Sequence, residues 1–320
     1  MIATPHYYHT TIAIAAIGAG LNVLTEKPLS VHKADCEAVI VAFEARPDKS
    51  KIFSEMFNQR TDKTYIKMRA MVQGGELGEF QRMNWIITNW FRTQAYYDNG
   101  GWRATWAGEG GGVLTNQCPH QLDLVQWICG MPSTVSANIS LGKYHDIEVE
   151  DDVTAMLEYP NGATGVFCAT TGESPGTNRF EVVGTLGKLV SEGGKLTHYK
   201  LSISSTDQIN GEEGAKTEVI DIDTDAEVND GSVGAGLGGN QHAKVMENFC
   251  QYIAGDASEL ISPGVEGING VELGNAMILS VSTQPFPTVL NLNHTDASHR
   301  LLGFRGSRTR RSHCRWTRRS

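Results

Sequence analysis

The stretch NVLTEKPLS, Asn22 to Ser30, decides how the fold of this chain is interpreted. A short apolar run, Val-Leu, is followed by a carboxylate, an ammonium and a proline at Glu26, Lys27 and Pro28. Ligands of open α/β sheets bind beyond the carboxyl ends of the strands, and proline restricts the direction in which the chain leaves a strand. The stretch therefore predicts a strand whose end belongs to a binding site. The ordinary alternative is an exposed Glu-Lys pair beside a turn.

The flanking residues have the pattern of an α/β unit. The segment IAT, residues 2–4, is expected to end a strand, and Pro5 to begin a helix that runs to about Ala19. Ser30 is expected to cap a second helix, roughly over residues 33–45. A further strand over residues 51–60 and a helix over about residues 62–72 follow. The apolar face of the second helix would consist of residues at helical spacing: Ala34, Ala38, Val41 and Ala42.

From Glu79 the pattern changes to alternating and aromatic segments, which are typical of strands. Asn161 and Gly162 form the two-residue turn that favours a tight hairpin. More strands are expected over residues 180–201, a loop or weak strand over 210–239, and helices over 241–254 and about 270–282. Together these segments predict a large, mostly antiparallel sheet in an α+β domain.

The composition is that of a globular protein large enough for two domains. The chain has 320 residues, of which 40% are apolar and 20% are charged. Its six cysteines lack CxxC pairs and regular spacing, which favours reduced thiols and a cytoplasmic location over a disulfide framework or a zinc site. The first 25 residues contain no Lys, Arg, Asp or Glu, but polar residues interrupt them and no basic segment precedes them. We therefore expect neither a signal peptide nor a membrane span.

The charge of the chain divides it into two regions. From Asn291 to the end there are eight Arg and one acid, Asp296, so this tail carries +7 and the remainder carries −16 of the net −9. An acidic body does not favour nucleic acid as a ligand. The tail lacks an amphipathic period, and we expect it to be the disordered product of a reading frame shifted from about Gln284. A nucleic-acid or membrane-surface arm is the alternative.

ATPHYYHTTIAIAAIGAGLNVLTEKPLS, Ala3 to Ser30, resembles the middle of the dinucleotide-binding domain of the Gfo/Idh/MocA oxidoreductases, the glucose-fructose oxidoreductase and inositol dehydrogenase family. The family order is Ala-Thr-Pro, a His, an Ala-rich helix, Gly, a strand and Glu-Lys-Pro. The strand that ends near Arg60 and the Gly-rich turn over residues 74–78 continue the resemblance. It implies the C-terminal part of an α/β Rossmann-type dinucleotide-binding domain, without its first strands, over residues 1–60, an α+β substrate and oligomerisation domain over 61–283, and a basic tail over 284–320.

GEGGGVLTNQCPHQLDLVQWICG, Gly108 to Gly130, is the second segment that can carry chemistry. It lacks the GxGxxG spacing of a phosphate-binding turn, but it opens a helix on which His120 and Asp123 share a face. The ordinary alternative for His120 is a satisfied core histidine. The family has the same loop, an acidic residue, its catalytic His and then Asp, so the resemblance implies that His120 is catalytic. Asn116 stands where most relatives carry Asp, and an amide can orient an imidazole but cannot stabilise its cation by charge.

The resemblance also implies roles for these residues. In our hypothesis His120 accepts the proton of a substrate hydroxyl, Lys27 bonds the same oxygen, and Asn116 and Asp123 orient His120 or the substrate. Glu26 would face the nicotinamide ribose. HDIEVEDD, residues 145–152, is interpreted as a strand with one solvated face, so no metal site is expected. The residues expected at the cofactor are Thr4, Pro5, His9, Glu26, Lys27, Pro28, Asn58, Trp102 and Arg103.

The resemblance implies an oxidoreductase that transfers a hydride between NAD or NADP and a secondary alcohol of a sugar, cyclitol or glycoside. The Gly-rich turn that holds the pyrophosphate and the acidic residue about 20 positions later are not in the sequence. We therefore expect an N-terminally truncated chain with an incomplete cofactor site and an unpaired sheet edge. The alternative is a non-catalytic sugar-binding or subunit-interaction protein. A homo-oligomer through the C-terminal sheet is expected.

Overall fold

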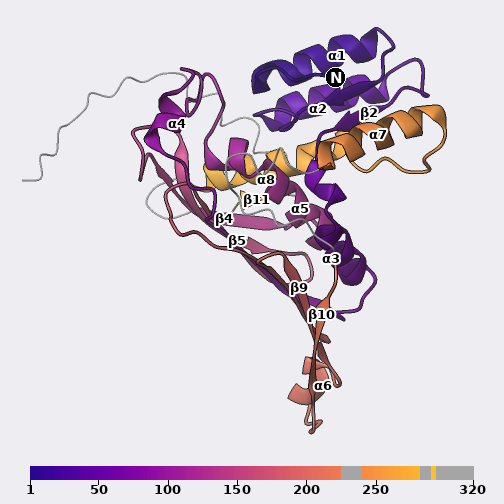
Figure 1. The fold of residues 1–320 in the computed structure, drawn as a ribbon, viewed down its shortest axis with the longest axis vertical. Coiled ribbons are helices and arrows are strands. Elements are labelled where there is room, and N and C mark those ends of the chain that lie inside the picture. Colours follow the sequence, from indigo (N-terminus) through magenta and orange to yellow (C-terminus); the bar gives the residue numbers. More distant parts are fainter. Residues whose placement is uncertain (225–239, 282–289, 293–320) are drawn as a thin grey trace, which may run out of the picture.

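The first residues of the chain form a small α/β part in the computed structural model, of which residues 1–224, 240–281 and 290–292 are described (Figure 1). β1 (Val23–Thr25) pairs in parallel with β2 (Phe53–Glu55), and Ile2 makes a parallel bridge to Thr25. Helices lie between these strands in the chain, because parallel neighbours need a crossover connection. The strand predicted from the Val-Leu run is therefore confirmed. The helices are a short 3₁₀ turn (His6–Tyr8), α1 (His9–Gly18) and α2 (Lys33–Glu44).

The buried side of α2 differs from the expected one. Val41 is 63% exposed, and Ala34 and Ala38 are exposed as well, whereas Cys36 and Val39 are buried. The helix packs against both α1 and α8 (Gly267–Val281). These two neighbours, rather than the most regular run of small residues, determine which stripe of the helix is buried.

The N-cap residue of α2 also differs from the predicted one. His32 occupies the N-cap position that was expected for Ser30. The hydroxyl of Ser30 instead donates a hydrogen bond to the carboxylate of Asp35 at 3.2 Å. Ser30 precedes the first helical residue, Lys33, by three positions, so its side chain meets an acid of the first turn and not a backbone N–H.

The second part of the chain is built on one large sheet. Among the described residues it has nine strands in the order β10-β9-β8-β7-β3-β6-β5-β4-β11, and only β3 and β6 run parallel to each other. The predicted mostly antiparallel sheet is therefore confirmed. The strands are β3 (Phe80–Ile87), β4 (Thr134–Leu141), β5 (Glu150–Glu158), β6 (Thr164–Thr170), β7 (Asn178–Gly184), β8 (Gly187–Glu192), β9 (Lys195–Leu201), β10 (Thr217–Ile222) and β11 (Leu290–Asn291).

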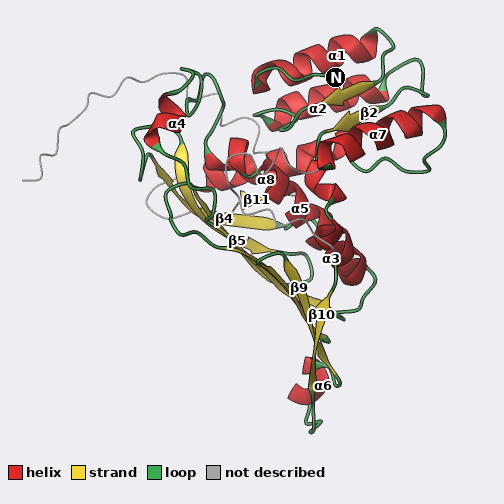
Figure 2. Ribbon diagram, in the orientation of Figure 1, coloured by secondary structure: helices red, strands yellow, loops and turns green. Residues whose placement is uncertain are grey.

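Helices pack along one face of this sheet (Figure 2). They are α3 (Lys63–Gln73), α5 (Pro119–Cys129) and α8, and the core between them and the sheet contains Trp85 stacked on Phe180 with 4.2 Å between the ring centroids. Two short helices, α4 (Gln94–Asp98) and α6 (Ser205–Ile209), lie near opposite ends of the sheet (Figure 1). On the other face Met156 of β5 is 65% exposed. No helix in the described ranges has the length and hydropathy needed to span a bilayer.

The last two long helices return to the N-terminal part. Val271 of α8 belongs to the core around β1 and β2, whereas Leu273 belongs to the core of the large sheet. Val245 of α7 (Gln241–Ala254) packs with Leu24 of β1 and with Met56, which follows β2. α7 has the predicted bounds, and α8 begins three residues before the predicted start. Helix α8 therefore holds the two parts of the molecule against each other.

The hairpin between β5 and β6 has a longer turn than predicted. Tyr159 and Ala163 close the loop by a backbone hydrogen bond of 2.8 Å, which leaves Pro160, Asn161 and Gly162 in the turn. Gly162 has a φ of +84°, the left-handed conformation that ends a three-residue hairpin loop. The Asn161 side chain accepts from the Ala163 N–H at 3.1 Å. The prediction of a two-residue turn is therefore wrong, because proline cannot take a positive φ and adds a residue to the turn.

Part of the basic tail has regular structure. Leu290–Asn291 forms β11, which is antiparallel to β4 with Leu290 opposite Val135. The expectation of disorder over residues 284–320 is therefore wrong for this segment. The edge of β4 presents backbone N–H and C=O groups, and residues 290–291 pair with them. Within the expected loop or weak strand over residues 210–239, Thr217–Ile222 is a strand. The other residues of the tail and residues 225–239 lie outside the described part of the chain.

Candidate active site

Lys27 and the segment before α5 meet in space. Lys27 lies two residues after the end of β1, its peptide bond to Pro28 is cis, and its ammonium donates a hydrogen bond to the backbone carbonyl oxygen of Asn116 at 2.9 Å. Asn116 lies in a π-helical turn, residues 113–117, that leads into α5. The end of the N-terminal sheet is thereby joined to the segment that carries His120.

The Gly-rich loop before this turn packs closely against the large sheet. The N–H groups of Gly112 and Leu114 both donate to the carboxylate oxygen Oε1 of Glu150, at 2.9 and 3.1 Å. A Cβ on Gly112 would lie 1.9 Å from the carbonyl oxygen of Glu150, so this position requires glycine. Burial raises the pKa of Glu150 to about 7. The glycines thus allow a close approach of the loop to β5.

His120 is the second residue of α5, after Pro119 at the first helical position. Its Nδ1 is buried and has no hydrogen-bond partner among the described residues. Burial, and then the charges of Lys27 and His242, lower the pKa of His120 well below its ordinary value. The imidazole is therefore neutral near pH 7, and the lowered pKa makes it a weaker base than a free imidazole.

Asn116 does not orient His120 through its side chain. Its amide Nδ2 donates instead to the carboxylate Oε1 of Glu109. Asn116 therefore connects Lys27, which bonds its backbone, with a buried acid of the Gly-rich loop. Sequence reasoning missed Glu109, although it is the one charged residue within a run of glycines, which was the available signal.

Asp123 has a different partner from the one expected. Its two oxygens accept from Nε and Nη2 of Arg60 at 2.8 and 2.6 Å, and the Gln126 amide adds a bond of 2.9 Å. Arg60 and Asp123 are 2% and 1% exposed. The spacing of three residues puts Asp123 on the same helix face as His120, but the buried guanidinium of Arg60 occupies its carboxylate. The orienting role expected for Asp123 is therefore not supported.

The residues expected at the cofactor surround the ends of the first strands. The ring nitrogens of His9 lie 2.8 Å from the carbonyl oxygens of Pro28 and of Thr4, so this buried residue joins the two loops. Thr4 and Pro5 are exposed beside it, and Glu26 is half-buried. His9 therefore holds the loop at Thr4 beside Pro28, in the loop that follows β1.

The three other expected residues are Asn58, Trp102 and Arg103. Asn58 is buried, its Nδ2 donates to Gln241 at 3.1 Å, and its Oδ1 has no partner in the described chain. Trp102 is 38% exposed and its ring meets the ring of His6 edge-on. Arg103 donates to the hydroxyl of Tyr96 at 2.8 Å. Two amides next to His120 add further buried oxygens with no hydrogen-bond partner among the described residues: those of Gln117 and Gln121.

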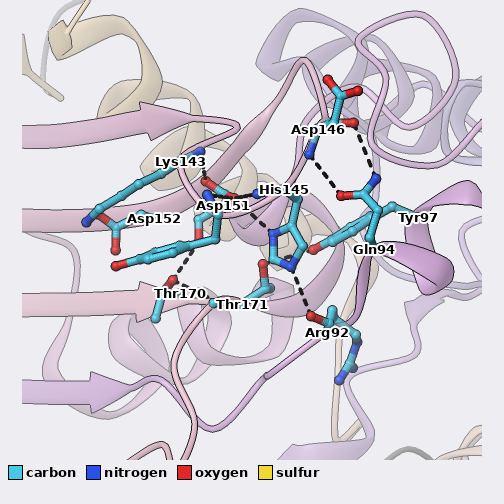
Figure 3. Close-up of polar contacts among 12 residues, drawn as sticks. Arg92, Gln94, Tyr97, Lys143, His145, Asp146, Asp151, Asp152, Thr170 and Thr171 are labelled. Atoms are coloured by element: carbon cyan, nitrogen blue, oxygen red, sulfur yellow. Dashed lines mark hydrogen bonds and ion pairs between the residues drawn. The ribbon is translucent and has the colours of Figure 1, made fainter. Parts of the chain in front are cut away.

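The acidic segment at residues 145–152 is a loop that enters β5, and its interpretation as a strand with a solvated face is wrong. Figure 3 shows Asp151 at the centre of this loop. It accepts the N–H groups of Lys143, Tyr144 and His145 at 2.8, 2.9 and 3.1 Å, and the His145 ring lies 3.0 Å from it. Glu150 and Asp151 are both fully buried. Backbone N–H groups of this loop satisfy Asp151, whereas Glu150 accepts N–H groups on Oε1 and its Oε2 has no partner among the described residues.

The same loop holds the segment next to α4. Nε2 of His145 lies 2.9 Å from the carbonyl oxygen of Arg92, and Tyr97 donates to the Thr171 hydroxyl at 2.9 Å (Figure 3). The cluster thus has a structural function. In the described part of the chain no group of three or more His, Cys, Asp or Glu side chains is placed to hold a metal ion.

Two models of one protein family match consecutive parts of the chain. A model described as an oxidoreductase family with an NAD-binding Rossmann fold matches residues 1–53. A model of the GFO/IDH/MocA C-terminal domain matches residues 65–190. Together they cover more than half of the chain.

Known proteins with similar sequences are dehydrogenases. Levoglucosan dehydrogenase of Pseudarthrobacter phenanthrenivorans is 26% identical over 59% of this chain and 54% of its own length. Trans-1,2-dihydrobenzene-1,2-diol dehydrogenase of Bos taurus is 30% identical over 58% of this chain and 52% of its own. Inositol 2-dehydrogenase of Corynebacterium glutamicum is 26% identical over 51% and 44%. The chain spans about half the length of the curated relatives it matches.

Solved structures share the fold over most of the chain. The WlbA dehydrogenase from Chromobacterium violaceum, solved with NADH and UDP-GlcNAcA, has a TM-score of 0.71 and 26% identity, over 90% of this chain and 76% of that one. Levoglucosan dehydrogenase with NADH and levoglucosan has a TM-score of 0.69 and 20% identity, over 92% and 79%. The fold is therefore a Rossmann domain followed by a domain with a large mixed sheet.

Proposed function

The chain belongs to the GFO/IDH/MocA oxidoreductase family, since models of both domains match it, and we propose that it is an NAD(P)-dependent dehydrogenase of a sugar, cyclitol or glycoside. One observation carries the proposal: Lys27 of the N-terminal part bonds Asn116, four residues before the neutral His120. An ammonium and an unprotonated imidazole at one place are what the oxidation of an alcohol needs from the protein.

The residues at the carboxyl end of β1 fit the nicotinamide end of such a cofactor. Asn58 and His120 each have a buried polar atom that lacks a partner within the described residues, as expected where a ligand supplies it. The half-buried Glu26 makes no side-chain hydrogen bond in the same ranges and is available to a ribose hydroxyl. Thr4, Pro5 and Trp102 would complete this end of the site.

The cofactor, when bound, supplies the chemistry of hydride acceptance from the alcohol carbon. His120 accepts the hydroxyl proton on its neutral imidazole. Lys27 donates a hydrogen bond to the same oxygen, and its charge stabilises the alkoxide that develops there. The secondary alcohol would thereby become a ketone, with its hydroxyl proton held on His120.

The substrate class rests on the amides around His120 and on the relatives. Gln117, Gln121 and Asn58 offer neutral hydrogen-bonding groups, which suit the hydroxyls of a sugar, cyclitol or glycoside. The names of the relatives include a levoglucosan and an inositol dehydrogenase. A neutral polyol agrees with both.

We also propose that the protein is a homo-oligomer that pairs through the open face of the large sheet. Met156, opposite Val166 on the neighbouring strand, is 65% exposed there, and Ile86 is 40% exposed. A second copy would cover these side chains. A cytoplasmic location is proposed as well, because all the cysteines in the described ranges are free thiols.

A titration of the purified chain with NADH and with NADPH, followed by cofactor fluorescence, tests the function. Saturable binding of one of the two, together with turnover of inositol or levoglucosan in a panel of polyols with the oxidised cofactor, would support the proposed dehydrogenase and would contradict the incomplete cofactor site expected from the sequence. Absence of cofactor binding together with calorimetrically detected binding of a polyol would favour the non-catalytic sugar-binding alternative. Lys33→Met, which removes a lysine ion-paired with Glu272 at 2.7 Å outside the site, is the control variant for Lys27→Met.

A further inference from the structure

Glu109 is a buried acid of the Gly-rich loop for which the proposed reaction has so far no use. It is 1% exposed. We infer that Glu109 is a positioning residue that supplies the negative charge facing Lys27, with Asn116 as the neutral link between them. The effect on alkoxide stabilisation by Lys27 rests on the proposed function, whereas the contacts of Glu109 are independent of it.

The contacts of Glu109 fix its carboxylate on both oxygens. Oε1 accepts from the amide of Asn116, and Oε2 accepts from the N–H of Ala104 at 2.7 Å. Nη1 of Arg103 lies 3.8 Å from Oε1. The carbonyl oxygen of Glu109 accepts from Nδ1 of His6 at 2.8 Å, so the N-terminal part also holds the residue. Three separate segments of the chain thus converge on one acid.

A nearby carboxylate favours the charged form of the Lys27 side chain. The hydrogen-bond acceptor of its ammonium in the described chain is the carbonyl of Asn116, which carries no charge. Burial lowers the pKa of Lys27, and the carboxylates of Glu26 and Glu109 raise it again, with smaller contributions from Cys118 and Glu55. An uncompensated buried ammonium would lose its proton more readily and with it the charge that stabilises an alkoxide.

Lys27 and Glu109 both form a hydrogen bond with Asn116. The other acids near Lys27 in the described chain form no hydrogen bond with Asn116. Glu26 precedes Lys27 and is half-buried at the cofactor side. Glu55 is fully buried, and burial raises its pKa well above the ordinary value, which disfavours its charged form. The imidazoles of His6 and His120 are neutral, because burial lowers the pKa of each, that of His6 to about 4.

The charge of Glu109 is itself balanced within this network. Burial raises the pKa of Glu109, and the charges of Arg103 and Lys27 lower it. An acid and an ammonium that stabilise each other's charged forms titrate as a coupled pair. Removing the acid should therefore shift the titration of Lys27 to lower pH, while every residue assigned to the substrate keeps its side chain.

The test is the titration of the Lys27 amine, measured by the pH dependence of its labelling with acetic anhydride and mass spectrometry of the full chain. This readout needs neither cofactor nor turnover, so it stays informative if the proposed dehydrogenase activity fails. In Glu109→Gln we expect the midpoint for Lys27 to fall by about one pH unit, which is roughly a tenfold faster labelling at a pH below the midpoint. An unchanged midpoint in the folded variant overturns the inference.

The matched control is Glu148→Gln. Glu148 also accepts a backbone N–H, that of Trp106 at 2.7 Å, but it is exposed and does not contact Asn116. We expect this variant to leave the Lys27 titration unchanged, and an equal shift in both variants would overturn the assignment to Glu109. Glu109→Asp keeps an acid at a greater distance and should shift the midpoint in the same direction by less. If Glu109→Gln does not fold, Glu109→Asp decides, and a wild-type midpoint in it contradicts the inference.

Discussion

The ammonium of Lys27 lies 2.9 Å from the backbone carbonyl oxygen of Asn116, although 89 positions separate the two residues in the chain. The contact links the end of a parallel strand to the turn that opens α5. It places the charge of Lys27 close enough to His120 to lower the pKa of that imidazole. Most consequences of the proposed function can be tested through this pair.

Replacing Lys27 by Met should lower kcat about 100- to 1000-fold and change KM little. The ammonium is assigned to the alkoxide that develops during the reaction, so its loss affects the transition state more than the bound alcohol. Steady-state kinetics with the accepted polyol measures both constants. A variant with the wild-type kcat would remove Lys27 from the mechanism, and Lys33→Met should behave as wild type.

Lys27→Met should also raise the pKa of His120. The positive charge of Lys27 is one of the causes that lower this pKa, after burial, so a neutral side chain makes protonation easier. NMR spectra of the imidazole recorded against pH would follow the change without any need for turnover. An imidazole that titrates identically in both proteins would mean that the two groups are not neighbours in solution.

Arg60→Leu should destabilise the protein by about 3 to 5 kcal/mol, because it leaves the buried carboxylate of Asp123 without its partner. Arg179→Leu is the matched control. Arg179 is also paired with an acid, Glu181, but on the accessible face of the sheet, and its loss should cost less than about 1 kcal/mol. Urea unfolding measures both variants. Equal losses would contradict the assignment of the Arg60 pair to the core.

Glu55→Gln should become more stabilising, relative to the wild type, as the pH rises. Burial and the charge of Asp123 raise the pKa of Glu55 well above its ordinary value. Between the unfolded and the folded pKa the native state holds one proton more than the unfolded state, so the wild type loses up to about 1.4 kcal/mol per pH unit. Thermal unfolding at pH 5 and pH 8 compares the two. A pH-independent difference in Tm would show that Glu55 is ionised in the native protein.

Met156→Glu should convert the proposed homo-oligomer into monomers, because it places a charge at the most exposed apolar position of the open sheet face. Light scattering after size-exclusion chromatography measures the mass in solution. Met246→Glu on α7, where the side chain is 40% exposed, is the control and should keep the oligomer. A wild-type chain that is monomeric at high concentration would contradict the proposal directly.

Local sequence signals predicted most of the elements. The Val-Leu run before Glu26, the small-residue helices and the alternating segments after Glu79 each predicted a strand or helix that the structure has. They did so because strand and helix formation depends on spacing within a few residues. The predictions that were wrong concern features set by contacts with residues distant in sequence. One example is the buried stripe of α2, which its contacts with α1 and α8 determine.

The sequence by itself determined the two-part fold and the positions of Lys27 and His120, since these depend on residue order and local pattern. The tertiary structure alone decided the partners: Arg60 for Asp123, Glu109 for Asn116, and β4 for Leu290–Asn291. Buried charged groups and strand edges need hydrogen-bond or ion-pair partners. Tertiary packing supplies these partners from residues that are distant in sequence, so no local sequence pattern predicts them.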